Sequence, residues 1–241
     1  MSLVVADIGN SRIKWGRCSA TAIDAYVSLP IDDANAWSAQ AREWSLDGES
    51  WIVASVQPQT RDRFVRWLHD RRRPVRVVES YRDLPIAVAV DHPERVGLDR
   101  LLDAVAANSR RAPNQCVAIV DAGSAVTVDL VDACGVFRGG AILPGLRLMT
   151  KSLHEYTAQL PLVEIRDRIS PPGTSTVAAI ETGVFHAVVG GIDRLLTDLF
   201  LSDATVFLTG GDASVLAPHL QTPCRVWPEM TLEGLRLVAT I

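Results

Sequence analysis

Two short loops, each with an aspartate followed two residues later by a glycine, hold the residues of this chain best suited to chemistry. In the segment Val117–Asp129, an apolar run ends at Asp121 and leads into a turn that contains Gly123. Glycine lets the backbone approach an anion closely and accept positive φ, so the amides of such a turn can face a phosphate group. The alternating apolar residues after the turn predict a second strand, which places the loop in a hairpin.

The N-terminus repeats this pattern. An apolar run, Leu3–Ala6, leads into Asp7 and Gly9, and an alternating segment follows. The two aspartates are 114 residues apart (121 minus 7), close to half of the chain. We interpret the pair as two related half-domains, each with a carboxylate and a loop of phosphate size; two ordinary hairpins with polar turns are the alternative. A third glycine loop, Thr209–Asp212, also follows an apolar strand.

Two facing loops of this kind suit a nucleoside triphosphate with Mg²⁺, because that ion prefers one or two carboxylates together with waters and phosphate oxygens. The Walker motif GxxxxGK[ST] and the dinucleotide motif GxGxxG are both absent from the sequence. Amides and hydroxyls of the loop residues would hold the phosphates, namely those of Asn10, Ser11, Ser124 and Thr127.

Phosphoryl transfer needs positioning, charge neutralisation and a base beside the acceptor hydroxyl. Asp99 is a candidate for this base, and both Asp99 and Arg100 fall in the first turn of a predicted helix. The positive end of the helix dipole favours the aspartate but not the arginine, so Arg100 is expected to have another partner. The alternative is that Asp99 only caps the helix and that Arg100 is solvated.

Composition narrows the class of protein. The chain has 241 residues, 48% of them hydrophobic and 22% charged, as expected for a soluble globular enzyme. A net charge of −4 excludes the basic excess of a nucleic-acid-binding protein, and the one basic cluster, Arg71–Arg73, is expected to cap a helix. The four cysteines lack the spacing of a zinc site or a disulfide framework. With no signal peptide and no membrane span predicted, we expect a cytoplasmic protein with reduced thiols.

Apolar periodicity and breakers predict alternating strands and helices along the chain. Thr60 is expected to cap the second helix, and a long helix is expected to start at Thr174, Ser175 or Thr176. The glycines inside that long helix predict close packing against a neighbouring helix or a second subunit. Other predicted helices cover residues 32–45, 146–154, 213–220 and 232–239, and other predicted strands cover 51–56, 75–78, 86–90, 136–143, 205–208 and 225–227.

Several motifs together resemble the type III pantothenate kinases, also called the Bvg accessory factor family, over nearly the whole chain. This family belongs to the superfamily of acetate and sugar kinases, heat-shock chaperone ATPases and actin. The matching segments are Asp7–Ser11 with Lys14, Ala54–Pro58, the GxDR segment Gly97–Arg100, Asp121–Asp129, Gly139–Gly145, Thr157–Pro161, Thr176 with Ala179–Gly183, and Leu208–Asp212.

The resemblance implies an α/β fold of two related ribonuclease H-like half-domains, with mixed sheets flanked by helices. We place the halves at residues 1–114 and 115–241. It also implies an activity: ATP phosphorylates pantothenate to 4'-phosphopantothenate, the first step of coenzyme A biosynthesis. The family is dimeric, so a homodimer is expected, with no nucleic-acid or membrane partner.

The resemblance also implies residue roles. Asp99 would take the hydroxyl proton, and Arg100 would hold the pantothenate carboxylate in bidentate geometry. Asp7 and Asp121 would act on Mg²⁺ and its waters, and Asp129 on a monovalent cation, K⁺ or NH₄⁺. The pantothenate pocket would include Val90, Gly97, Leu98, His154 and, from the partner subunit, Thr176. The nucleotide site would include Asp7, Gly9, Asn10, Ser11, Lys14, Gly123, Ser124, Thr127, Gly210 and Gly211.

Three positions depart from the family pattern. Val90 stands where many members have a tyrosine, Ser124 replaces a threonine, and the segment Gly173–Thr176 lacks the usual lysine. Val90 motivates a second hypothesis, a related kinase with another small hydroxy acid as acceptor. A third hypothesis is a non-catalytic ATP-binding regulator; the intact Asp99 argues against it.

Overall fold

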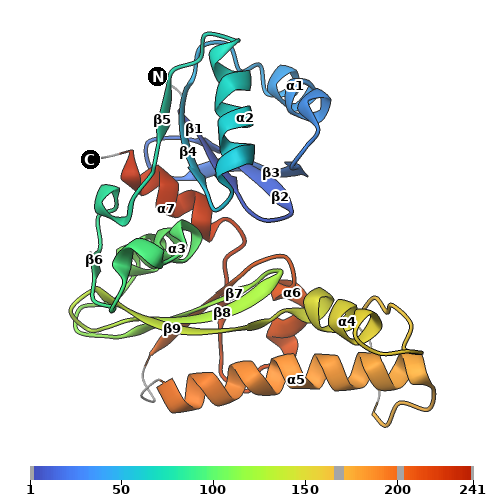
Figure 1. The fold of residues 1–241 in the computed structure, drawn as a ribbon. Helices are drawn as coiled ribbons and strands as arrows, with labels where there is room; N and C mark the ends of the chain where they lie inside the picture. The colour runs from blue at the N-terminus through green and yellow to red at the C-terminus, as the bar shows by residue number, and fades with distance from the viewer. Residues whose placement is uncertain (1–2, 166–170, 200–203, 240–241) are drawn as a thin grey trace. The chain divides into compact units, whose positions relative to one another are not determined.

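The structure, a computed structural model, describes residues 3–165, 171–199 and 204–239. The chain divides into two compact units. The first contains residues 1–110 and 229–241, and the second contains residues 111–228. Each unit is an α/β fold built on one mixed sheet (Figure 1).

The sheet of the first unit has the order β3-β2-β1-β4-β5. Strands β1, β2 and β3 form an antiparallel meander, whereas β4 and β5 run parallel to β1. Their bounds are β1 Leu3–Ile8, β2 Arg12–Cys18, β3 Ile23–Pro30, β4 Ser50–Ser55 and β5 Val75–Val77.

The second unit repeats this topology. Within it, neighbouring strands follow the order β11-β10-β7-β8-β9, with β7, β8 and β9 antiparallel and β10 and β11 parallel to β7. Their bounds are β7 Val117–Ala122, β8 Ala125–Val131, β9 Val136–Pro144, β10 Thr205–Thr209 and β11 Arg225–Val226. The predicted repeat therefore extends from two loops to two whole half-domains, and the predicted fold class is confirmed.

Two layers of helices cover the first sheet. Helices α1 (Ala34–Glu43) and α2 (Pro58–His69) close one face over an aromatic cluster, whose ring centroids are 5.0–5.9 Å apart. Helices α3 (Leu98–Ser109) and α7 (Met230–Val238) pack together, and α7 contacts β1, β2 and β4. The cluster consists of Trp15, Trp37, Trp51, Phe64 and Trp67.

The second sheet has an aliphatic core instead. The long helix α5 (Thr176–Leu199) buries Val184, Phe185, Val188 and Ile192 against β7 and β8. The helix α4 (Leu146–Glu155) lies beside α5, and α6 (Ala213–Leu216) follows β10 (Figure 1). The shorter elements of the chain are the 3-10 turns η1 Tyr81–Asp83, η2 Pro93–Arg95 and η3 Ala217–His219, and the short strand β6 Ala87–Val88.

The domain boundary differs from the predicted one at the C-terminus. The prediction assigned residues 115–241 to one half, but residues 229–241 belong to the first unit. The reason is burial: Met230, Leu232, Leu235 and Val238 on α7 are all 0% exposed, and α7 packs on α3 and β1. The apolar face of this helix must be buried against another element, but the local sequence does not identify which of the two cores it packs on.

Other predicted elements shift by a few residues. The second helix begins at Pro58, so Thr60 lies inside it and donates its hydroxyl to Gln57 Oε1 (3.1 Å). Proline is favoured at the first helical position, which explains the earlier start. As predicted, the arginine cluster caps the C-terminus of α2: Arg71 Nη1 donates to the carbonyl of Trp67 in the last turn (3.1 Å). Among the described residues, no helix has the length and apolar character needed to cross a bilayer.

Candidate active site

The first acidic loop is closed by its own backbone. Asp7 is the penultimate residue of β1, is 6% exposed, and pairs in register with Lys14 of β2. Residues directly opposite each other on antiparallel strands project to the same face, so the two side chains share one face of the sheet. The amide of Gly9 donates to the carbonyl of Arg12 (3.1 Å).

The segment Ala54–Pro58 braces this loop. The amide of Val56 donates to the carbonyl of Ile8 (3.2 Å), and Gln57 Nε2 donates to the carbonyl of Asn10 (3.1 Å). These two bonds tie Ile8, the last residue of β1, and Asn10, in the loop, to the segment that follows the parallel strand β4. Gln57 was not among the predicted site residues, although it lies in a segment that the resemblance had marked.

The second acidic loop has the same construction with one residue fewer. Asp121 is the penultimate residue of β7 and pairs with Thr127 of β8, while Gly123 donates its amide to the carbonyl of Ala125 (3.1 Å). Asp129 lies two residues after Thr127 and therefore projects to the same face. The structure thus brings Asp121, Thr127 and Asp129 together on one face of the second sheet.

Asp129 needs a glycine on the neighbouring strand. It is 1% exposed and pairs with Gly140 of β9. A Cβ at Gly140 would overlap the carbonyl oxygen of Val128 and would lie 2.7 Å from Asp129 Oδ1. The Gly139–Gly140 segment therefore makes room for a buried carboxylate between two strands.

The third glycine loop lies directly against the second acidic loop. Gly210 has φ +97°, and a Cβ there would overlap the backbone of Ala122 and would lie 2.5 Å from Asp121 Oδ1. The amide of Asp212 donates to the carbonyl of Ala122 (3.0 Å). Because β7 and β10 are parallel neighbours, their carboxyl ends meet at one edge of the sheet. The loop residues Gly123 and Ser124 and the loop residues Gly210 and Gly211 accordingly lie at the same edge of this sheet.

Asp99 and Arg100 open α3 as predicted. The helix starts at Leu98 after Gly97, and Asp99 Oδ1 accepts the backbone amide of Arg100 (2.8 Å). A Cβ at Gly97 would overlap that same carboxylate oxygen. The segment therefore fixes the direction of the Asp99 carboxylate while leaving it only partly buried. Asp99 can accept this amide with Oδ1 and still take part in chemistry, because a carboxylate has a second oxygen, Oδ2.

Thr176 lines a cavity of the second unit, and His154 contacts Leu160, another lining residue. The cavity has a volume of about 520 Å³ and is mostly apolar, and Thr176, Leu160 and Gly183 are among its lining residues. His154 Nδ1 is 2.8 Å from the carbonyl of Leu160, so a neutral His154 ring carries its proton on Nδ1. Val90, the remaining predicted pocket residue, is half-buried and lies two residues after β6.

The family model described as type III pantothenate kinase matches residues 3–198. The chain belongs to this family. A type III pantothenate kinase of Rhodopirellula baltica is 36% identical over 93% of each chain. Another, of Porphyromonas gingivalis strain W83, is 38% identical over 98% of this chain and 96% of the relative.

Solved structures agree on the fold. One described as a Baf family transcriptional activator of Campylobacter jejuni has a TM-score of 0.65 at 20% identity, with 98% of this chain and 97% of that chain covered. An activator of 2-hydroxyisocaproyl-CoA dehydratase of Clostridium difficile has a TM-score of 0.56 at 14% identity, with 99% and 93% covered. At these identities the likeness establishes the fold alone.

Pantothenate kinases of this family use ATP with a divalent metal, and the residues present fit that use. Asp121 is partly exposed at the end of β7, and Gly210 places no Cβ beside its Oδ1. Mg²⁺ is usually held by one or two carboxylates plus phosphate oxygens and waters, so single aspartates of this kind are sufficient.

Asp212 was not predicted as a site residue. It begins α6 without a side-chain hydrogen bond to cap it, and its burial raises the pKa of its carboxyl group. The only sequence signal for it is its place at the end of the third glycine loop.

The first prediction concerns Gly210 in this kinase. Gly210→Ala is expected to lower the free energy of unfolding by about 3 kcal/mol, because it adds a strained φ to a backbone overlap. Gly211→Ala is the matched control: nothing lies within 4 Å of a Cβ there. Its cost should stay within about 0.5 kcal/mol. Urea unfolding measures both, and equal costs would contradict the proposed contact between Gly210 and Ala122.

The second prediction concerns Asp212 and pH. Because its folded-state pKa is raised, the folded chain holds this proton more tightly than the unfolded chain, whose pKa is about 3.9. The resulting stabilisation is present at low pH and is lost as pH rises through the folded-state pKa. Asp212→Asn should therefore raise the melting temperature of the nucleotide-free protein at pH 7, and the gain should shrink toward pH 4. The exposed Asp32→Asn is the control, and a gain independent of pH would contradict the assignment.

Proposed function

We propose that this chain transfers the γ-phosphoryl group of ATP to the terminal hydroxyl of pantothenate and so forms 4'-phosphopantothenate, the first step of coenzyme A synthesis. The observation that carries the proposal is the equivalent aspartate-glycine turn in two half-domains of one topology, together with the segment Gly97–Arg100 at the start of α3. Membership of the family supports the choice of acceptor.

Asp99 is the proposed base. The amide of Arg100 orients one carboxylate oxygen, and the other accepts the proton of the attacking hydroxyl. Arg100 is the proposed ligand of the pantothenate carboxylate, because a guanidinium gives two parallel charge-assisted hydrogen bonds to such a group. Both residues lie on one rigid helix, which keeps their separation constant while the acceptor binds.

The proposed phosphate contacts come from the two turns that follow β1 and β7. The amides of Gly9 and Gly123 close these turns, and we assign the contacts with the nucleotide to Asn10, Ser11 and Ser124. Asp7 and Asp121 are the proposed carboxylates for Mg²⁺, which when bound neutralises charge on the transferring group. Lys14 and Thr127 complete the phosphate contacts, and Gly210 with Gly211 contacts the adenosine.

Asp129 is the proposed ligand of a monovalent cation, K⁺ or NH₄⁺. Its burial between β8 and β9, on the same face as Asp121, supports a site that supplies positive charge near the nucleotide. A kinase that consumes ATP is also expected in the cytoplasm, which cell fractionation would test.

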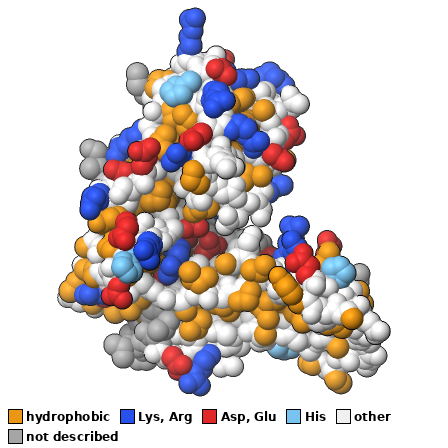
Figure 2. Space-filling model, in the orientation of Figure 1, with side chains coloured by type: hydrophobic (Ala, Val, Ile, Leu, Met, Phe, Trp, Pro, Cys, Tyr) orange, Lys and Arg blue, Asp and Glu red, His pale blue; other side chains and the backbone are white. Residues whose placement is uncertain are grey.

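We also propose a homodimer in which Thr176 of one protomer reaches the pantothenate pocket of its partner. Helix α5 exposes a row of small residues at helical spacing, and a Cβ at Gly183 or Gly190 would meet nothing within 4 Å. Close packing within the chain is found at Gly191, where a Cβ would lie 3.2 Å from Leu143 Cδ1. A large apolar residue on the same helix, Val177, is also exposed (45%), and Figure 2 shows hydrophobic side chains gathered on this unit.

The central test is a coupled assay of ATP consumption in which ATP, pantothenate, Mg²⁺ and K⁺ are omitted one at a time. Turnover should require all four. Asp99→Asn should lower kcat by about 10²–10⁴-fold, because it removes general-base catalysis, and should leave ATP affinity unchanged. The exposed Asp91→Asn is the control. Retained turnover in Asp99→Asn would remove the base from the mechanism.

Other outcomes of that assay separate the competing hypotheses. Turnover with a different small hydroxy acid but not with pantothenate would favour the related kinase that Val90 suggests. ATP binding without any acceptor would favour the non-catalytic regulator. Full activity in Na⁺ alone would exclude the proposed cation role of Asp129.

Arg100→Ala should raise the KM for pantothenate by about 10–100-fold, since charge-assisted hydrogen bonds contribute about 1.5–3 kcal/mol. Arg95→Ala is the matched control, because Arg95 lies in the preceding turn with its side chain 76% exposed. An unchanged KM for pantothenate in Arg100→Ala would contradict the carboxylate role.

Gly190→Arg should convert a dimer into a monomer and lower turnover, because the bulky charge lies on the proposed contact face. Arginine is also a better helix former than glycine, so folding of α5 should not suffer. Sedimentation velocity measures the state, with the exposed Gln59→Arg on α2 as control. A wild-type chain that sediments as a monomer would contradict the dimer.

A further inference from the structure

Helix α7 packs against α3, the helix that starts with the proposed catalytic pair. Midway along α7, a Cβ at Gly234 would overlap the carbonyl oxygen of Leu102 and would lie 2.7 Å from the carbonyl carbon and 3.0 Å from the Cα of that residue. These are backbone atoms of α3, only three residues after Asp99. The two helices can approach this closely only because residue 234 has no side chain.

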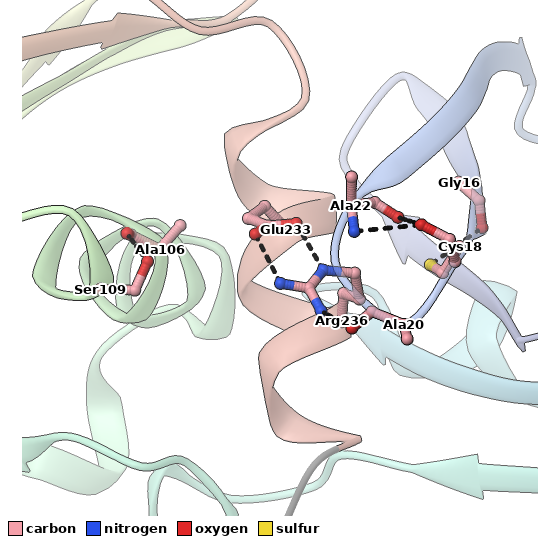
Figure 3. Close-up of polar contacts among 9 residues, drawn as sticks. Gly16, Cys18, Ala20, Ala22, Ala106, Ser109, Glu233 and Arg236 are labelled. Carbon is pink, nitrogen blue, oxygen red and sulfur yellow. Dashed lines mark hydrogen bonds and ion pairs between the residues drawn. The ribbon is translucent and has the colours of Figure 1, made fainter.

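A buried ion pair fixes α7 on the sheet. Arg236 donates from Nε and Nη2 to the two carboxylate oxygens of Glu233, at 2.7 and 2.8 Å, and from Nη1 to the carbonyl of Ala20, at 2.9 Å (Figure 3). The two side chains are 8% and 9% exposed. A fork of this kind is geometrically specific, and Ala20 belongs to the turn between β2 and β3.

A second bond holds the end of α7. Arg76, on β5, donates from Nη1 to the carbonyl of Val238 (3.2 Å), the last residue of the helix. A positive group is favourable at a helix C-terminus. Helix α7 is therefore tied to the first unit at two points in its last turn, Arg236 and Val238, and it cannot move away from the sheet without breaking these bonds.

We propose that Gly234 is a positioning residue for the acceptor site: α7, held by Arg236, sets the distance of α3 from the sheet and so places Asp99 and Arg100. The inference rests on the proposed roles of those two residues. A helix moves as a rigid body over one turn, so a displacement at Leu102 reaches Asp99. Misplacement of a reacting group by about 1 Å can lower a rate about 10²-fold.

The competing explanation is that Gly234 serves packing alone, in which case its replacement would lower stability without a specific effect on the acceptor. Leu68→Ala separates the two explanations. Leu68 is 0% exposed and lies in the aromatic core on the α1 and α2 side of the same sheet. Its truncation weakens the same unit without touching the α3–α7 contact.

The experiment compares Gly234→Ala, Leu68→Ala and the wild-type full-length chain, each assayed at the same interval below its own melting temperature. For Gly234→Ala, kcat/KM for pantothenate should fall at least tenfold while the Kd for ATP, measured without pantothenate, stays within threefold. Hydrogen exchange in the peptide covering residues 98–109 should become faster. Leu68→Ala should lower the melting temperature and leave kcat/KM within twofold.

Wild-type kinetics in Gly234→Ala, or an equal loss in Leu68→Ala, would overturn the inference. If Gly234→Ala does not fold, Arg236→Lys replaces it: the charge stays, the fork and the bond to Ala20 are lost, and a smaller change in the same direction is expected. If the wild-type chain itself does not phosphorylate pantothenate, the proposed function fails, whereas exchange in residues 98–109 still tests the contact between α7 and α3.

Discussion

Three of the four proposed acidic groups of this kinase, all except Asp7, lie at a close backbone approach that a side chain would prevent. Asp121 lies against Gly210, Asp129 against Gly140, and Asp99 against Gly97. In each case a Cβ on the glycine would approach a carboxylate oxygen to 2.7 Å or less. A buried or half-buried carboxylate needs polar neighbours to offset its desolvation, and backbone amides can supply them only if the chain comes this near. The glycines therefore set where negative charge can be held.

The two half-domains show that topology and core chemistry are separable. Both sheets have the same strand order and the same switch from antiparallel to parallel pairing at the central strand. One core is built from tryptophan and phenylalanine rings, and the other from valine, isoleucine and leucine. What the two share is alternation on the central hairpin and an aspartate one residue before the strand ends. The residues shared by the two half-domains thus lie at the ends of the central strands, where the proposed chemistry takes place. The interior of each half-domain needs only enough apolar volume to fill its core.

The last helix, α7, packs against α3, the helix that carries the proposed acceptor residues Asp99 and Arg100. After β11 in the second unit, the chain returns to the first unit and buries α7 beside α3. The side chains of its ion pair are 8% and 9% exposed, so removal of one partner would leave the other charged and buried. If α7 positions Asp99 and Arg100 as we propose, the acceptor site is supported by Glu233 and Arg236, which lie 134 and 137 positions after Asp99 (233 minus 99 and 236 minus 99).

The sequence by itself determined the local elements and the identity of the acids. Alternation with a period of two predicted both hairpins, and the Asp-x-Gly turns at their tips located the candidate phosphate loops. The helix start at Gly97–Arg100 was equally local, because the dipole and the glycine act within one turn. Only the tertiary structure decided that α7 belongs to the first unit, that Gln57 braces Asn10, and that Arg236 donates to the carbonyl of Ala20. These depend on which distant surfaces meet, and periodicity carries information about the face that a segment buries but not about its partner.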